Sequence, residues 1–160
     1  MVSKIDSGEE MDSMITMFRE HGMGNFPTLL MRLSTSPGMM YYLDNTESHR
    51  VALNENYGRE LLELFSLGVG QDEAFNYSED DVKACARAFT GWNVAPAYPP
   101  FPYGRSPWQF RYDPADHDDS EQTFLGRTGR WNGGRHRHHH LPATCHGPLP
   151  LAAPVRLLCR

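Results

Sequence analysis

Apolar side chains recur at helical spacing through the first forty residues of the chain. The segments 11–21 and 26–33 each place them close to a 3.6-residue period, and Gly22 follows the first segment as a stop. Ser36 and Pro37 then supply an N-cap and a first-turn proline for a third segment, 39–43. The periodic residues are Met14, Ile15, Met17, Phe18, Phe26, Leu29, Leu30, Leu33, Met39, Met40, Tyr41 and Leu43. The pattern predicts three short amphipathic helices whose methionine and aromatic stripes form core.

The next two helices are the most clearly marked in the sequence. One begins at Asn54 or Glu55 and ends at Gly68, with its apolar positions at i, i+4, i+7 and i+8 from Tyr57. The other begins after Ser78, has three acidic residues in its first turn, and ends at Gly91. Negative charge there favours the positive end of the helix dipole.

The character of the chain changes after Asn93. Six prolines lie between Pro96 and Pro114, which excludes a regular helix and predicts a loop. Within 108–113, aromatic and polar residues alternate with the period of two that is typical of a half-buried strand, which we expect to pair with 123–125. The predicted fold is therefore mainly α, with a proline-rich loop and at most one short β-hairpin.

Composition and charge narrow the class of protein. The apolar fraction is 39% and the mean hydropathy is −0.57, so the predicted core is thin. Residues 1–132 carry 11 basic against 20 acidic side chains, so a basic nucleic-acid footprint is absent and we expect no nucleic-acid partner.

The three cysteines, Cys85, Cys145 and Cys159, are odd in number and lack the spacing of a zinc site, so they predict neither a zinc site nor a complete set of disulfides. No segment is apolar enough to span a membrane, and no signal peptide is present, so the chain as written is expected in the cytoplasm.

One polar constellation could carry chemistry. It comprises Asn54, Glu55, Asn56, Arg59, Glu60 and Glu63, with Asp44, Asn45 and His49 upstream and His117, Asp118 and Asp119 downstream. On a helix, Asn56, Glu60 and Glu63 share one face, so Glu60 and Glu63, with Arg59 beside them, are candidate acid–base or catalytic groups. His117, Asp118 and Asp119 are candidate metal ligands if their loop folds back over this helix.

A plainer hypothesis competes with this site. Arg59 would pair with Glu55 and Glu63 at i±4, while Asp118 and Asp119 would be turn residues. No HExxH, GxSxG, P-loop or GxGxxG spacing supports a particular enzyme class, and the cofactor stays unknown. The plainer hypothesis is favoured.

Three runs of sequence resemble a known family. They are YYLDNTESHRVALNENYGRELLELFSLGVG (41–70), YSEDDVKACARAFTGW (77–92) and FRYDPADHDDSEQTFLGRTGRW (110–131). In this order they resemble the bacterial family catalogued as domain of unknown function 1800, over about residues 12–132. The family-like positions include Asp44, Asn45, Asn54, Glu55, Asn56, Arg59, Glu60, Gly91 and Trp92. The resemblance implies a mainly helical protein of several hundred residues, often exported, whose activity is not established.

The chain departs from the family pattern at both ends. The resemblance implies further helices ahead of Met11, which would be the natural packing partners of faces such as that of Tyr57, Leu61 and Leu64. After Gly133 the sequence turns rich in histidine and proline. Read one nucleotide later, with permitted codons, residues 134–149 become DDIVTIIFRQPATARF, which resembles the family's next helix. A displaced reading frame would explain the tail and would leave its histidines (His136, His138, His139, His140 and His146) without a selected role.

These expectations define the domain plan and the hypotheses on function. We expect a disordered start (1–10), a partial helical domain (11–132) and a disordered, frame-shifted tail (133–160). The first hypothesis is an inactive fragment of an uncharacterised helical protein, which is more consistent with no enzyme activity. The second is part of a metal-dependent hydrolase, and the third is a binding module of an exported assembly that uses the loop 96–114.

Overall fold

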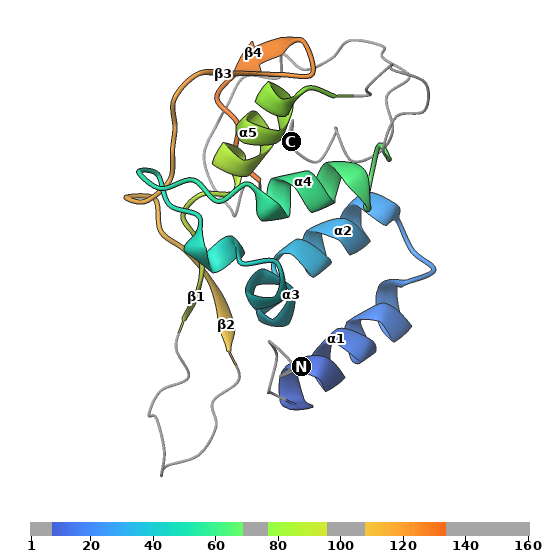
Figure 1. The fold of residues 1–160 in the computed structure, drawn as a ribbon. Helices are drawn as coiled ribbons and strands as arrows, with labels where there is room; N and C mark the ends of the chain where they lie inside the picture. The colour runs from blue at the N-terminus through green and yellow to red at the C-terminus, as the bar shows by residue number, and fades with distance from the viewer. Residues whose placement is uncertain (1–7, 69–76, 96–107, 134–160) are drawn as a thin grey trace, which may run out of the picture.

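A computed structural model of the protein describes residues 8–68, 77–95 and 108–133. Its helices are α1 (Gly8–His21), α2 (Phe26–Ser34), α3 (Pro37–Tyr42), the 3-10 turn η1 (Asn45–Glu47), α4 (Asn56–Glu63) and α5 (Glu79–Ala88). Its strands are β1 (Trp92–Ala95), β2 (Gln109–Tyr112), β3 (Gln122–Phe124) and β4 (Arg127–Gly129). In Figure 1, α5 lies between α4 and the β3–β4 hairpin, and α1 lies at the opposite edge of the molecule beyond α2 and α3.

The first three helices follow the sequence pattern closely. The side chain of Asn25 caps α2 by accepting the N–H of Thr28, and Pro27 occupies its first turn. Pro37 likewise lies in the first turn of α3, but the predicted N-cap, Ser36, makes no side-chain hydrogen bond to the helix. Helix α1 begins at Gly8, three residues before the expected start, with two acidic residues in its first turn. Of the four apolar residues of α1 expected in the core, Met14 and Met17 are half-buried, whereas Ile15 and Phe18 are exposed.

Helices α4 and α5 form the centre of the molecule. Helix α4 ends at Glu63 instead of continuing to Gly68, and Leu64 is exposed while Leu62 is buried. A Cβ atom on Gly58 would lie 2.8 Å from the backbone nitrogen of Ala86, so glycine permits the two helices to approach closely. Tyr57 and Leu61 are buried within this chain, so these two residues have packing partners here, whereas Leu64 of the same predicted face does not.

The strand pairing differs from the expected one. Strand β2 pairs antiparallel with β1, with Trp92 opposite Tyr112, and not with 123–125. Strand β3 pairs with β4 through a tight hairpin whose turn residues Leu125 and Gly126 both have positive φ. The described residues thus contain two small two-stranded sheets, where the sequence predicted at most one hairpin. The prediction was wrong because Trp92–Ala95, which the sequence analysis placed at the start of a loop, forms a strand. Its residues alternate between buried and half-buried positions.

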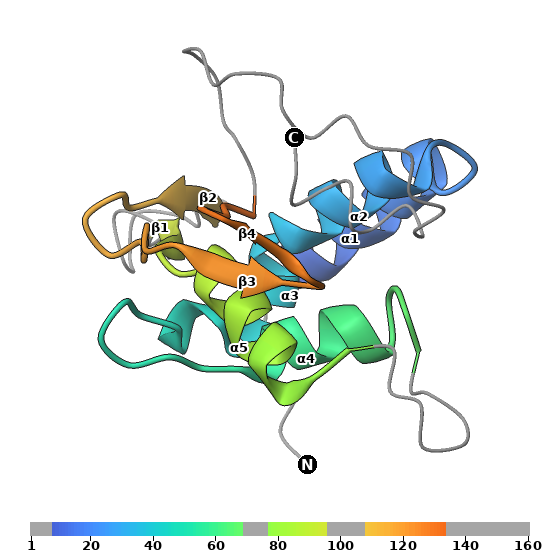
Figure 2. The ribbon, with the colours of Figure 1, turned by 90° about the horizontal axis from the view of Figure 1, so that it is seen from above.

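Aromatic rings connect these elements into one core. Tyr57, Phe89, Trp92 and Phe110 follow one another edge to face, with centroids 4.8, 4.9 and 5.0 Å apart. The Tyr57 hydroxyl also makes a short hydrogen bond with the buried Ser34 hydroxyl on α2. Figure 2 shows the β3–β4 hairpin against α5, with α4 packed beside the same helix. The core therefore joins both halves of the described chain.

Candidate functional site

The charged face of α4 is an ion-pair network centred on Arg59. Its guanidinium lies 3.4 Å from Glu55 and 3.7 Å from Glu63, as the plainer hypothesis predicted. The structure adds Glu79 at the start of α5, which accepts two hydrogen bonds from Arg59 at 2.8 and 3.0 Å. These hydrogen bonds lower the pKa of Glu79. The network fastens α4 to α5 and engages both Arg59 and Glu63.

The neighbouring family-like residues shape the chain before α4. Asn56 donates from its side chain to the carbonyl of Leu43, and the side chain of Asn54 accepts the N–H of Asn56 at 2.9 Å. Asp44 has a left-handed backbone with φ of +56° and precedes η1, in which Asn45 is buried. These roles are local and structural. Glu60 is half-buried on α4.

His117 and Asp118 belong to the loop after β2, and they contact Thr90, two residues beyond the end of α5. His117 is buried, and its Nδ1 lies 3.0 Å from the carbonyl oxygen of Thr90. The N–H of Asp118 donates to the Thr90 hydroxyl at 2.8 Å, and the Asp118 carboxylate lies 3.5 Å from Arg87. Burial would raise the pKa of Asp118, but hydrogen bonds from Ser120 and the nearby guanidinium groups hold it below its ordinary value.

The expected metal ligands do not converge on α4. Asp119 is exposed and pairs with Arg130 at 3.2 Å. Within residues 8–68, 77–95 and 108–133, no hydrogen bond or ion pair joins His117, Asp118 or Asp119 to Glu60 or Glu63. In the same ranges, no group of three or more His, Cys, Asp or Glu side chains could hold a metal ion. The tail histidines and most of the loop 96–114 lie outside the described residues.

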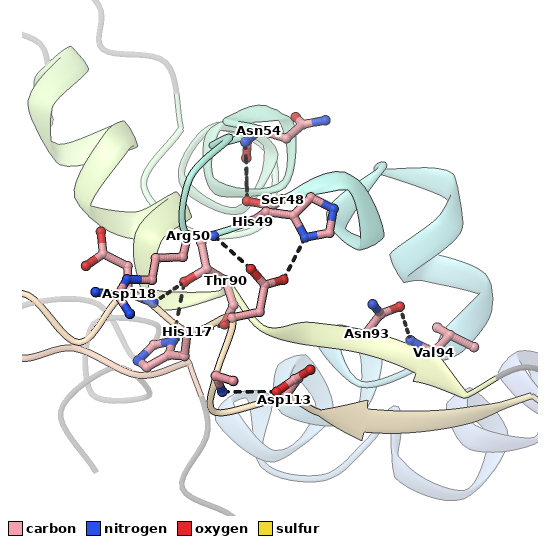
Figure 3. Close-up of polar contacts among 12 residues, drawn as sticks. Ser48, His49, Arg50, Asn54, Thr90, Asn93, Val94, Asp113, His117 and Asp118 are labelled. Carbon is pink, nitrogen blue, oxygen red and sulfur yellow. Dashed lines mark hydrogen bonds and ion pairs between the residues drawn. The ribbon is translucent and has the colours of Figure 1, made fainter.

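A second polar cluster joins two loops that the sequence did not connect. His49 Nδ1 lies 2.6 Å from Asp116 Oδ2, and the other carboxylate oxygen accepts the N–H of Arg50 at 3.1 Å. His49 belongs to the loop after η1 and Asp116 to the loop after β2. Figure 3 shows His49 and Arg50 near Thr90, His117 and Asp118. Both oxygens of Asp116 are therefore fixed, while the side chains of His49 and Asp116 stay 40% and 29% exposed.

Local structure explains how these two side chains meet. His49 opens a tight turn closed by reciprocal hydrogen bonds between its backbone and that of Ala52, at 2.9 and 3.1 Å. Across the cluster, the N–H of Asp113 donates to the carbonyl of Gly91 at 2.7 Å. A Cβ atom on Gly91 would collide with the Asp113 carbonyl, and φ at Gly91 is +75°. Glycine at this position lets the loop carrying Asp116 dock beside α5.

The pairing determines the tautomer of His49. Burial would raise the pKa of Asp116, but hydrogen bonds from His49 and the Arg50 N–H lower it, so the carboxylate is ionised and accepts. Nδ1 must therefore carry the proton. In the neutral ring, Nε2 then holds the lone pair, because the proton is on Nδ1. An oriented imidazole with an available lone pair can accept a proton from a substrate or a water molecule.

Sequence reasoning found one member of this pair and missed the other. His49 was named as a neighbour of the α4 constellation, whereas Asp116 was overlooked among four aspartates between 113 and 119. A separation of 67 residues carries no periodic signal. Gly91 was the one sequence signal for this contact. A glycine directly after a well-capped helix allows another segment to approach the backbone closely, and here that segment is the loop that carries Asp116.

Comparison with known proteins identifies one family. None of the helices in the described part of the chain is long and apolar enough to cross a membrane. No curated protein and no solved structure matches the chain. A family model, described as protein of unknown function (DUF1800), matches residues 1–141, which extends beyond the three motifs at both ends. The chain belongs to this DUF1800 family.

Proposed function

We propose that His49 and Asp116 form a general acid–base pair of a hydrolytic site. The observation that carries the proposal is the 2.6 Å contact between His49 Nδ1 and an Asp116 carboxylate whose second oxygen is also fixed. A carboxylate that orients an imidazole and stabilises its protonated form is the arrangement that hydrolases use to activate a nucleophile. The His49 side chain is 40% exposed, so a reacting group can reach the ring.

The proposal replaces the α4 carboxylates as the preferred catalytic candidates. Glu63 is engaged by Arg59, and no comparable orienting bond reaches Glu60 within the described residues. The His49–Asp116 pair alone does not identify the substrate, so the test uses simple activated esters.

The test is the hydrolysis of p-nitrophenyl acetate and p-nitrophenyl phosphate by the full chain and its variants, measured against pH. We expect hydrolysis above the buffer rate, and a loss of about 10²- to 10⁴-fold in His49→Ala, which is the usual contribution of general acid–base catalysis. Asp116→Asn should also lower kcat, because the amide can stabilise the wrong tautomer.

A matched control is available on α1. His21 Nε2 lies 3.7 Å from the carboxylate of Glu20. This second imidazole–carboxylate pair differs from the first because, within the described residues, no backbone N–H donates to its carboxylate. His21→Ala should leave the rate unchanged. Equal rates for His49→Ala and the unmodified chain, or no hydrolysis above buffer with either ester, would overturn the proposal.

A further inference from the structure

Helix α1 carries an apolar stripe on its outer side. Met11, Ile15 and Phe18 are 43%, 42% and 42% exposed, and their spacing of i, i+4 and i+7 places them on one face. A different face of α1, with Glu10, Met14 and Met17, is turned toward the rest of the chain. Single exposed apolar residues are ordinary, but a continuous stripe marks an interaction surface. At the same end of α1 as Phe18, Met23 and Phe26 are also exposed.

Charges border this stripe in a self-complementary order. Asp12 and Arg19 are both exposed, and their positions on the helix place them along the same edge of the stripe. Neither makes an ion pair with another side chain in the part of the chain that the structure describes. They lie three residues before and four residues after Ile15, so the stripe has an acid toward one end and a base toward the other.

We propose that α1 binds a second copy of this chain, with the two α1 helices antiparallel about a two-fold axis near Ile15. In that arrangement Ile15 meets its equivalent, Met11 meets Phe18 of the other copy, and Asp12 of each copy meets Arg19 of the other. A two-fold contact uses the same patch on both partners, which the order of acid, apolar residue and base allows. In a parallel pair the two-fold axis runs along the helices, so the charged edges of the two copies lie on opposite sides of the contact and Asp12 does not meet Arg19. Only the antiparallel orientation brings the opposite charges together.

The position of α1 in the fold leaves room for this contact. It lies at the edge of the molecule, on the far side of α2 and α3 from α4 and α5 (Figure 1). A contact centred on one helix is small compared with stable interfaces, so we expect a dissociation constant on the order of 10–100 μM. The dimer would leave the acid–base pair accessible in both copies.

The experiment is sedimentation equilibrium of the full chain from about 1 to 300 μM, with four variants. Asp12→Arg and Arg19→Asp should each weaken the dimer by roughly tenfold, because each change places like charges together at two symmetric positions. The double variant Asp12→Arg/Arg19→Asp should restore the dissociation constant to within about threefold of the starting value. Ile15→Asp should abolish the dimer.

A control variant and two outcomes make the result decisive. Asp80→Arg/Lys83→Asp swaps an exposed pair of opposite charges on α5 and should leave dimerisation unchanged. Circular dichroism on each variant checks that α1 still folds. A chain that is monomeric over the whole range would overturn the proposal, and so would a double variant that dimerises no better than either single one.

Discussion

Single residues with unusual backbones decide how the loops of this protein approach the helices. Gly91 has φ of +75° and lies against the backbone of the loop that carries Asp116. Gly126 has the same φ, but a Cβ atom there would meet nothing within 4 Å. Both positions therefore need a residue that tolerates positive φ, but only Gly91 also needs a residue without a side chain.

We predict that Gly91→Ala lowers the free energy of unfolding more than Gly126→Ala does. The left-handed backbone should cost about 1–2 kcal/mol at either site, and the collision with the Asp113 carbonyl should add to this at Gly91 only. Urea unfolding followed by tryptophan fluorescence measures both. Equal losses would show that the loop moves aside without cost.

A buried acid gives a second prediction at this scale. Glu10 is 4% exposed and accepts the N–H of Trp108 at 3.2 Å, and its burial raises the pKa. Because the folded-state pKa is raised, the charged form weakens folding as pH rises through that pKa. Glu10→Gln keeps an acceptor and removes the charge, so we expect equal or greater stability at neutral pH. A lower melting temperature than that of the unmodified chain at neutral pH would contradict it.

At the scale of elements, one carboxylate connects a helix to a hairpin. Asp81 completes the capping box of α5 with Ser78, and its Oδ1 accepts the N–H of Leu125 at 2.6 Å. Burial would raise the pKa of Asp81, but the hydrogen bonds from Ser78 and Leu125 lower it. The sequence signalled the cap, whereas the bond to the hairpin spans 44 residues and appears only in the fold.

Removing this carboxylate should loosen both elements. We expect Asp81→Ala to cost about 2–3 kcal/mol, because a helix cap is lost and the N–H of Leu125 is left without its partner. Asp80→Ala, at the next position with an exposed side chain, should cost less than about 0.5 kcal/mol.

The pH dependence checks the cause of that difference. Since the folded-state pKa of Asp81 is lowered, its contribution is present above the ordinary value of 3.8 and is lost as pH falls through the lowered value. Urea unfolding between about pH 7 and pH 2 should show the gap between Asp81→Ala and the unmodified chain closing at the acid end. A gap that stays constant would rule out the charged hydrogen bonds as its source.

At the scale of the whole molecule, the composition of the tail after Gly133 leads to a prediction about the gene. We predict that the reading frame is displaced by one nucleotide near codon 134, because the alternative frame yields DDIVTIIFRQPATARF with helical periodicity in place of a histidine-rich run. Nucleotide sequencing of the gene from independent isolates tests this. An unaltered frame in every isolate would make the tail a true product, and its metal binding would then be measured directly.

The sequence by itself determined the α-helices, the starts of α2 to α5, and the family. Local signals suffice for these, because caps, prolines and 3.6-residue spacing act within a single turn or two. It also predicted the pairing of Arg59 with Glu55 and Glu63, which depends on helix geometry alone. Only the tertiary structure decided the strand partners, the meeting of His49 with Asp116, and the exposure of Ile15 and Phe18. Those features depend on which segments pack together across long separations, and the hydrophobic effect that drives such packing is non-directional.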